Sequence, residues 1–219
     1  MKRNELVIVL HGLGRTPLSM WGVTNALRKQ GYDVAAWGYP SIMGGMQDHI
    51  TRLSKRFSGL SGYDKIHGVG HSLGGLMLRG VLSNTPHLPL GRIVMMGTPN
   101  NGASMITRHG WLFNKGPLNR QIIRDLEPGS AMLAALPIPP AEIGIIAGVE
   151  QFSPANPMSW INHRVFGATP HDGTVEVSST KLPNMADFME VKANHSFLPF
   201  NRQVIRATVG FINTGKFTP

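Results

Sequence analysis

The sequence has no cysteine among its 219 residues. This absence excludes a disulfide framework, a cysteine nucleophile and any metal site built on thiolates. Hydrophobic residues make up 42% of the chain, a share typical of globular domains and well above that of disordered chains. The fold must therefore be stabilised by an ordinary apolar core.

Long hydrophobic runs are also absent. A membrane-spanning helix needs about 18 consecutive apolar residues, and no segment approaches that length. The N-terminus is charged and then enters the short apolar run Leu6–Leu10, which is too short for the core of a signal peptide. We therefore expect a cytoplasmic protein with no integral membrane segment.

Acidic residues are scarce, with 12 Asp and Glu against 21 Lys and Arg, for a net charge of +9. Such a balance suits an anionic partner such as nucleic acid or acidic lipid. However, the basic residues are scattered, and the densest group is Arg52, Lys55 and Arg56 in one expected helix. No aromatic residues alternate with them, as they would in a nucleic-acid groove. We expect a solvated basic surface and no nucleic-acid partner, while peripheral contact with acidic lipid is compatible with the charge.

Glycine and proline separate short apolar runs that alternate with segments of helical periodicity. This pattern predicts an α/β fold with a mainly parallel sheet of about six strands and helices on both faces. The expected strands are Leu6 to Leu10, Val34 to Trp37, Lys65 to Val69, Ile93 to Met96, Ile143 to Ala147 and Phe188 to Val191. The expected helices are Leu18 to Gln30, Met46 to Phe57, Leu73 to Asn84 and Pro199 to Ile212.

No change of composition marks a domain boundary, so we predict a single domain over residues 1–219. The segment from Ala103 to Pro140 is longer than an ordinary crossover and is rich in apolar residues. We expect two or three short helices there. They form either a small cap over a site or filler at one edge of the sheet.

A candidate nucleophile lies in the segment Gly70-His71-Ser72-Leu73-Gly74, between an expected strand and an expected helix. A sharp strand-to-helix turn strains the serine backbone, and glycines two residues to either side remove side chains that would collide there. Ser72 could instead simply cap the helix, since serine is a favoured N-cap residue. That role does not require both glycines, so we interpret Ser72 as a nucleophile.

A serine nucleophile needs a base, and the base needs a third group to hold it. When the nucleophile lies on such a strand-to-helix turn of an α/β sheet, the order along the chain is nucleophile, acid, base. His195 is the last histidine and follows an expected strand, at the sheet edge where open α/β sheets build their sites. The other histidines are interpreted as surface residues or as hydrogen-bonded core residues, and His71 is expected to point elsewhere on the turn.

Eight acidic residues lie between Ser72 and His195. Asp172 begins a turn-forming Asp-Gly pair, which leaves its carboxylate on a loop. Asp187 is the rival, but it begins the strand before His195, at the end remote from the base. We therefore favour Asp172 as the acid, the alternative being a plain turn residue.

Acyl transfer also needs hydrogen-bond donors for the negative charge that develops on the carbonyl oxygen. One candidate is the backbone N–H of Leu73, at the start of its helix. The other is the N–H of Leu13 in the segment His11-Gly12-Leu13-Gly14, where two glycines allow a tight turn. This segment lacks the spacing of a phosphate-binding loop, and its other interpretation is an ordinary turn between a strand and a helix.

The chain resembles bacterial lipases and esterases of the α/β-hydrolase superfamily, in particular its compact members. The segments that carry the resemblance are His11-Gly12-Leu13-Gly14, Gly70-His71-Ser72-Leu73-Gly74-Gly75, Gly97-Thr98-Pro99-Asn100, Asp172-Gly173-Thr174-Val175 and Asn194-His195-Ser196. The resemblance spans most of the chain. It implies an α/β-hydrolase fold, a Ser72–Asp172–His195 catalytic triad, and Leu13 and Leu73 as oxyanion-hole amides. It also implies a carboxylic-ester hydrolase that uses no cofactor and acts on a small-molecule or lipid ester.

The same triad would equally serve an acyltransferase, or a thioesterase or deacylase. A non-catalytic binding protein of this fold is a further alternative. A metal hydrolase lacks support, since no H-E-x-x-H or comparable ligand spacing occurs. Candidates for the acyl pocket are Met43, Met105 and Trp111, although such residues also serve as ordinary core packing.

Overall fold

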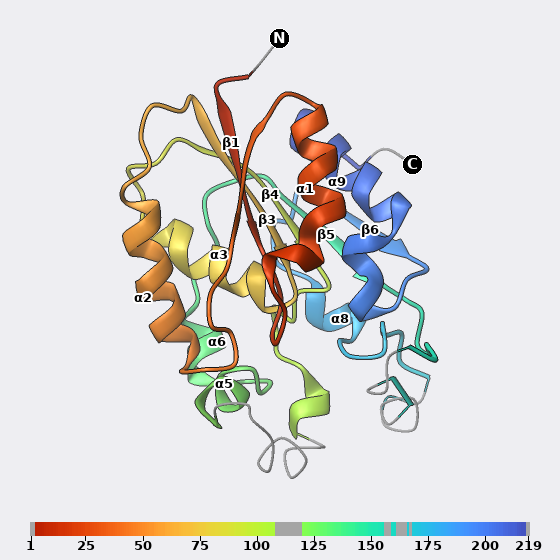
Figure 1. The fold of residues 1–219 in the computed structure, drawn as a ribbon. Coiled ribbons are helices and arrows are strands. Elements are labelled where there is room, and N and C mark those ends of the chain that lie inside the picture. The colour runs from red at the N-terminus through yellow and green to blue at the C-terminus, as the bar shows by residue number, and fades with distance from the viewer. Residues whose placement is uncertain (1–2, 108–119, 156–158, 161–165, 167, 218–219) are drawn as a thin grey trace.

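The computed structural model describes residues 3–107, 120–155, 159–160, 166 and 168–217. Its centre is a six-stranded sheet with the order β2-β1-β3-β4-β5-β6, in which every neighbouring pair is parallel (Figure 1). The strands are β1 (Glu5–Leu10), β2 (Asp33–Trp37), β3 (Lys65–His71), β4 (Leu90–Met96), β5 (Ile143–Gly148) and β6 (Asp187–Val191). All six expected strands are present, and the predicted fold class is confirmed.

Strand β1 shows why the central strands are continuously apolar. Leu6, Ile8 and Leu10 enter the hydrophobic core on one face of the sheet, whereas Val7 and Val9 enter a second core on the other face. Successive side chains of a strand point to opposite faces. A strand that is covered on both faces therefore carries no polar alternation.

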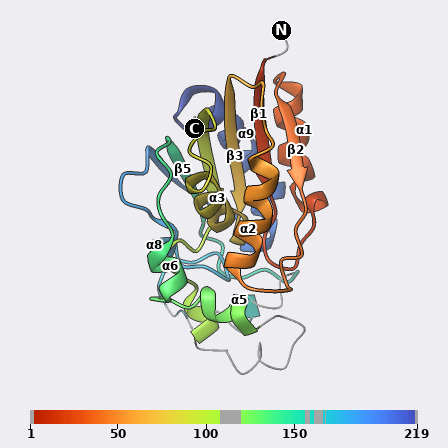
Figure 2. The same ribbon diagram turned by 90° about the vertical axis from the view of Figure 1, so that its left-hand side faces the viewer.

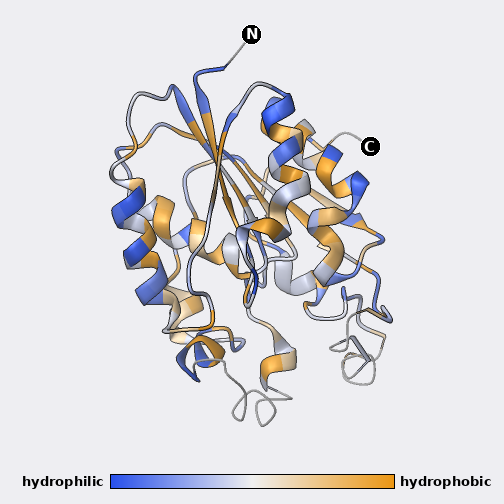
Figure 3. Ribbon diagram, in the orientation of Figure 1, coloured by the Kyte–Doolittle hydropathy of each residue, from blue (hydrophilic) through white to orange (hydrophobic). Residues whose placement is uncertain are grey.

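Two pairs of long helices cover the faces. Helices α2 (Met46–Phe57) and α3 (Leu73–Ser83) lie on one face, and α1 (Trp21–Lys29) and α9 (Arg202–Thr214) lie on the other (Figures 1 and 2). Figure 3 shows apolar residues along the strands and a hydrophilic outer side on α2. None of the helices in the described ranges is long and apolar enough to cross a membrane.

Two helix starts differ from the sequence prediction. The 3-10 turns η1 (Pro17–Met20) and η2 (His195–Phe200) precede α1 and α9, so the predicted starts at Leu18 and Pro199 were wrong. Helix α9 begins at Arg202 because the side chain of Asn201 accepts hydrogen bonds from the N–H groups of Gln203 and Val204, at 2.8 and 3.2 Å. An N-cap of this kind fixes where a helix starts.

Short helices lie beyond the carboxyl ends of the strands (Figure 1). They are α5 (Arg120–Asp125), α6 (Ala131–Ala135) and α8 (Val177–Thr180). Helices α5 and α6 belong to the segment 103–140, part of which lies outside the described residues, and the single-domain assignment stays a prediction. The buried guanidinium of Arg79 on α3 holds the end of this segment by donating to the carbonyl oxygens of Leu136 and Pro137, at 2.6 and 3.2 Å.

Buried histidines make the fold sensitive to acid. Burial lowers the pKa of His11, His49, His67 and His71. As the pH falls below about 6.5, the unfolded chain therefore binds more protons than the folded chain, and stability decreases. His49 also lowers stability at neutral pH, because neither of its buried ring nitrogens has a hydrogen-bond partner. The expectation that core histidines are hydrogen-bonded is wrong for this residue.

We predict that His49→Leu raises the melting temperature by roughly 2 to 4 °C at pH 7, because an apolar side chain removes two buried polar atoms that lack partners. The decrease in melting temperature between pH 7.5 and 5.5 should also become smaller. Thermal unfolding at both pH values measures this. His87→Leu, at an exposed position on the loop before β4, is the control. A melting temperature that His49→Leu lowers would contradict the prediction.

Candidate active site

Ser72 lies at the sharp turn between β3 and α3. Its backbone has φ 53° and ψ −124°, a conformation that non-glycine residues rarely adopt. A Cβ atom on Gly70 would lie 2.5 Å from the N atom of Gly75, and one on Gly74 would lie 2.8 Å from the carbonyl oxygen of His11. Both glycines are therefore needed for the turn. The side chain of Ser72 makes no capping hydrogen bond, so its hydroxyl is available for another partner.

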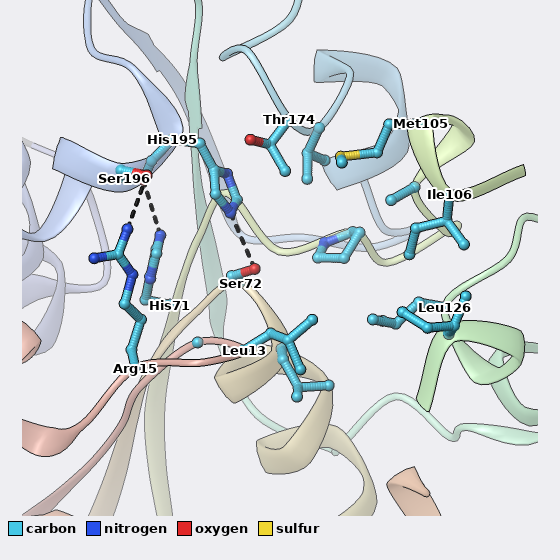
Figure 4. A pocket seen from close by; sticks show the side chains of 16 residues that line it. Leu13, Arg15, His71, Ser72, Met105, Ile106, Leu126, Thr174, His195 and Ser196 are labelled. Carbon is cyan, nitrogen blue, oxygen red and sulfur yellow. Dashed lines mark hydrogen bonds between the residues drawn. The ribbon is translucent and has the colours of Figure 1, made fainter. Parts of the chain in front are cut away.

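That partner is His195, the first residue of η2. Its Nε2 atom lies 3.0 Å from Ser72 Oγ (Figure 4), and its Nδ1 atom lies 2.7 Å from Asp172 Oδ2. A carboxylate only accepts hydrogen bonds, so the proton of the neutral imidazole is on Nδ1. Nε2 is then left with a lone pair that accepts the hydrogen bond from the Ser72 hydroxyl.

Asp172 is buried next to the imidazole and is 1% exposed. Its Oδ1 atom accepts the backbone N–H groups of Thr174 and Val175, at 3.0 and 2.7 Å, which leaves Oδ2 for His195. The rival Asp187 begins β6, where its side chain accepts the N–H of Phe217 at 2.8 Å. The structure thus brings Asp172, and not Asp187, to the base.

His71 has a role that the sequence analysis did not find. Its Nε2–H donates to the carbonyl oxygen of His195 at 3.0 Å (Figure 4). Burial lowers the pKa of His71 well below its usual range, and the neighbouring His195 lowers it further. His71 is therefore a neutral donor that ties the turn carrying Ser72 to the loop carrying His195.

The ring of His11 holds the loop that follows β1. The ring of His11 stacks on Tyr39, with 4.6 Å between ring centroids, and its Nε2 accepts the Tyr39 N–H at 3.4 Å. Nδ1 therefore carries the proton and donates to the carbonyl oxygen of Gly12 at 2.9 Å. The N–H of Arg15 donates to the same carbonyl at 3.2 Å. The peptide unit between Gly12 and Leu13 is thus fixed through its carbonyl group.

A cavity of about 240 Å³ opens beside Ser72 (Figure 4). It is lined by Gly12, Leu13, Arg15, His71, Ser72, Leu73, Pro99, Ala103, Met105, Ile106, Ile123, Leu126, Thr174, Val175, His195 and Ser196. Both expected oxyanion residues, Leu13 and Leu73, belong to this wall. Most of the remaining wall is apolar, as expected of a site that binds an acyl chain.

The three pocket candidates have different outcomes. Met105 lines the cavity. The placement of Met43 was wrong, because its side chain is 67% exposed and lines a separate surface hollow with Pro40 and Asp48. Trp111 lies outside the described residues. The sequence analysis gave no role to Arg15, which follows Gly14, or to Ser196, which follows His195. The two side chains are joined by a 2.9 Å hydrogen bond.

No group of three or more His, Asp or Glu side chains in the described part of the chain is arranged to hold a metal ion. The polar groups next to Ser72 are instead hydrogen-bonded to one another. The arrangement can move a proton from a serine hydroxyl to an imidazole supported by a carboxylate.

The parallel sheet, with a serine at a strained turn after β3 and a histidine beyond β6, defines an α/β hydrolase. A family model described as palmitoyl protein thioesterase matches residues 6–132, more than half of the chain. The chain belongs to this family, and it is therefore a hydrolase. No curated protein sequence matches it significantly.

Solved structures show the same fold. The lipase BlEst2 from Bacillus licheniformis in its mature form has a TM-score of 0.71 at 18% identity, over 96% of this chain and 91% of that chain. The propeptide form of that lipase also gives 0.71 at 16% identity, and this chain spans 50% of it. The metagenomic carboxyl esterase MGS0156 has a TM-score of 0.70 at 16% identity, over 99% of this chain and 72% of that chain. The predicted resemblance to bacterial lipases and esterases is confirmed at the level of the superfamily and its fold.

Proposed function

We propose that the protein is a serine hydrolase that cleaves carboxylic esters through an acyl-enzyme intermediate. The observation that carries the proposal is the unbroken hydrogen-bond chain Ser72–His195–Asp172, with heavy-atom distances of 3.0 and 2.7 Å, at the wall of a largely apolar cavity. Family membership supports the same reaction class.

In the acylation step, His195 Nε2 removes the proton of Ser72 as Oγ attacks the ester carbonyl carbon. Asp172 keeps the imidazole in the tautomer that accepts this proton and stabilises the imidazolium that forms. The imidazolium then donates its proton to the alcohol oxygen as the bond between carbonyl carbon and alcohol oxygen breaks. The acyl group remains on Ser72.

The oxyanion is assigned to the N–H groups of Leu13 and Leu73. The first N–H groups of a helix have no partner within the helix, and Leu73 begins α3. In a trans peptide the N–H points opposite to the carbonyl. Since the Gly12 carbonyl is bound by His11 and Arg15, the Leu13 N–H is directed away from those donors. Each such donor contributes about 3 to 4 kcal/mol to the stability of the transition state.

Deacylation repeats the steps with water as the nucleophile. His195 removes a proton from water as its oxygen attacks the acyl carbon. The proton then returns to Ser72 Oγ as the carboxylic acid leaves. His195 and Asp172 keep their roles in both halves of the reaction.

The proposal predicts covalent labelling of Ser72 by a fluorophosphonate probe, together with hydrolysis of p-nitrophenyl esters. The cavity, about 240 Å³, is smaller than the roughly 300 to 1,000 Å³ usual for small-molecule sites. We therefore expect a higher kcat/KM on short acyl chains than on a chain of sixteen carbons. Mass spectrometry of the labelled peptide and rates across the ester series measure both. Absence of label together with absence of turnover would refute the proposal.

Thioester cleavage is a second candidate, and the family match favours it. The same acyl group should be compared as a p-nitrophenyl ester and as an N-acetylcysteamine thioester. A thioesterase would give the larger kcat/KM on the thioester after correction for the uncatalysed rate of each compound. An oxygen-ester hydrolase would give the opposite order.

A further inference from the structure

The cavity beside Ser72 has two unlike sides. Met105, Ile106 and Leu126 lie on one side of Ser72 and form an apolar wall (Figure 4). Arg15, with His71 and Ser196, lies on the other side. A substrate whose two halves differ in polarity would therefore bind in one direction only.

Arg15 determines the electrostatic sign of the polar side. No Asp or Glu belongs to the cavity wall, and Arg15 is the one permanently charged residue among the lining residues described. Within the described ranges, no carboxylate lies at ion-pair distance from its guanidinium. No described carboxylate pairs with this charge, so the polar side attracts anions.

Arg15 is exposed, and one side-chain hydrogen bond orients its guanidinium. Its Nη2 atom donates to Ser196 Oγ at 2.9 Å, and the backbone N–H of Arg15 closes a turn onto the Gly12 carbonyl at 3.2 Å. A guanidinium has five N–H donors in a planar fork, so the bond to Ser196 leaves donors for a ligand. Carboxylates and phosphates match this fork because two of their oxygens bind in parallel.

The direction of the substrate follows from the chemistry of His195. Its Nε2 must reach the leaving oxygen, so the alcohol half lies toward the loop that carries His195. Ser196 is the next residue on that loop, and consecutive Cα atoms are only about 3.8 Å apart. The acyl half then lies against the apolar wall, and the alcohol half lies toward Arg15.

We propose that Arg15, fixed by Ser196, forms a subsite for an anionic group on the alcohol part of the substrate. The ligand chemistry is a carboxylate or a phosphate close to the scissile bond. This inference rests on the proposed function, and it narrows the substrate class to esters with an apolar acyl half and an anionic alcohol half.

The test compares three butyryl esters whose phenol parts differ at one position: those of 4-hydroxybenzamide, 4-hydroxybenzoate and 4-hydroxyphenyl phosphate. In Arg15→Gln, kcat/KM for an anionic ester should fall about ten-fold further than kcat/KM for the neutral benzamide ester, as expected for the loss of a charge-assisted hydrogen bond. The larger of the two anionic losses identifies the carboxylate or the phosphate as the preferred group.

Two variants separate this subsite from other roles of Arg15. Ser196→Ala removes the hydroxyl that accepts the Arg15 hydrogen bond and retains the charge of Arg15. This variant should keep most of the preference for anionic esters. Arg52→Gln removes an exposed charge on α2, outside the cavity wall, and should leave all three rates unchanged.

Equal losses for all three esters in Arg15→Gln would overturn the subsite, because Arg15 would then act only through the His195 loop. Absence of any loss, or an equal loss in Arg52→Gln, would overturn it as well. If the wild-type protein hydrolyses none of the three esters and fluorophosphonate does not label Ser72, the proposed function itself fails. A different result, in which the wild-type enzyme is active and Arg15→Gln affects the neutral and anionic esters equally, would contradict only the subsite.

Discussion

Ser72→Ala is expected to lower kcat/KM for p-nitrophenyl butyrate by about 10⁴-fold or more, the scale of loss when a serine nucleophile is removed from such a triad. Ser72 Oγ is the atom that His195 Nε2 contacts, and alanine has no atom that can attack the ester. The backbone turn depends on Gly70 and Gly74 and not on the serine hydroxyl. The melting temperature should therefore change by only a few degrees, and fluorophosphonate labelling should disappear.

Ser58→Ala is the matched control, since Ser58 is an exposed residue directly after α2 whose hydroxyl donates only to the carbonyl of Lys55 among the contacts described. It should retain the wild-type rate. The nucleophile assignment fails if Ser72→Ala stays folded and keeps most of its activity. Steady-state kinetics together with thermal unfolding of the same preparations decide this.

The sheet could be predicted from the sequence because its signal is local. Strands covered on both faces must be apolar at consecutive positions, and runs such as Leu6–Leu10 and Ile143 to Ala147 satisfy this directly. The starts of α1 and α9 could not be predicted from the apolar pattern. They depend on 3-10 turns and on the cap at Asn201, features that the apolar periodicity of the helices does not contain.

The residues of the triad could be selected from local context and chain order, because the glycines around Ser72 and the Asp-Gly turn at Asp172 have local physical causes. The contacts that support the triad could not be predicted from the sequence. His71 meets His195 across 124 positions of the chain, and Arg15 meets Ser196 across 181. Such contacts depend on how the loops pack together, which single-sequence patterns do not encode.

The errors have the same origin. Met43 is apolar and lies between two motifs, yet it is on the outer surface, since residue type alone does not determine which way a loop side chain points. His49 was expected to have a hydrogen-bond partner, but α2 packs it against Tyr39 with neither ring nitrogen bonded. In both cases tertiary packing overrides what the residue type suggests.

Asp172→Asn is expected to lower kcat/KM by about 10³ to 10⁴-fold while the fold is retained. The backbone N–H groups of Thr174 and Val175 occupy Oδ1, so the amide oxygen of the introduced asparagine must take that position. Its NH₂ group then faces His195 Nδ1 and donates to it. The imidazole must switch its proton to Nε2, which then donates to Ser72 instead of accepting from it. The base is present but in the tautomer that cannot remove the serine proton.

Asp187→Asn is the matched control for the loss of one carboxylate, because Asp187 is at the opposite end of β6 and binds the N–H of Phe217. Its rate should stay near that of the wild type. The rate of fluorophosphonate labelling should fall in Asp172→Asn and not in Asp187→Asn, since labelling needs the same proton transfer as acylation. If Asp172→Asn retained more than about a tenth of the wild-type kcat/KM, a loss of less than about 1.4 kcal/mol, the tautomer would not depend on this carboxylate.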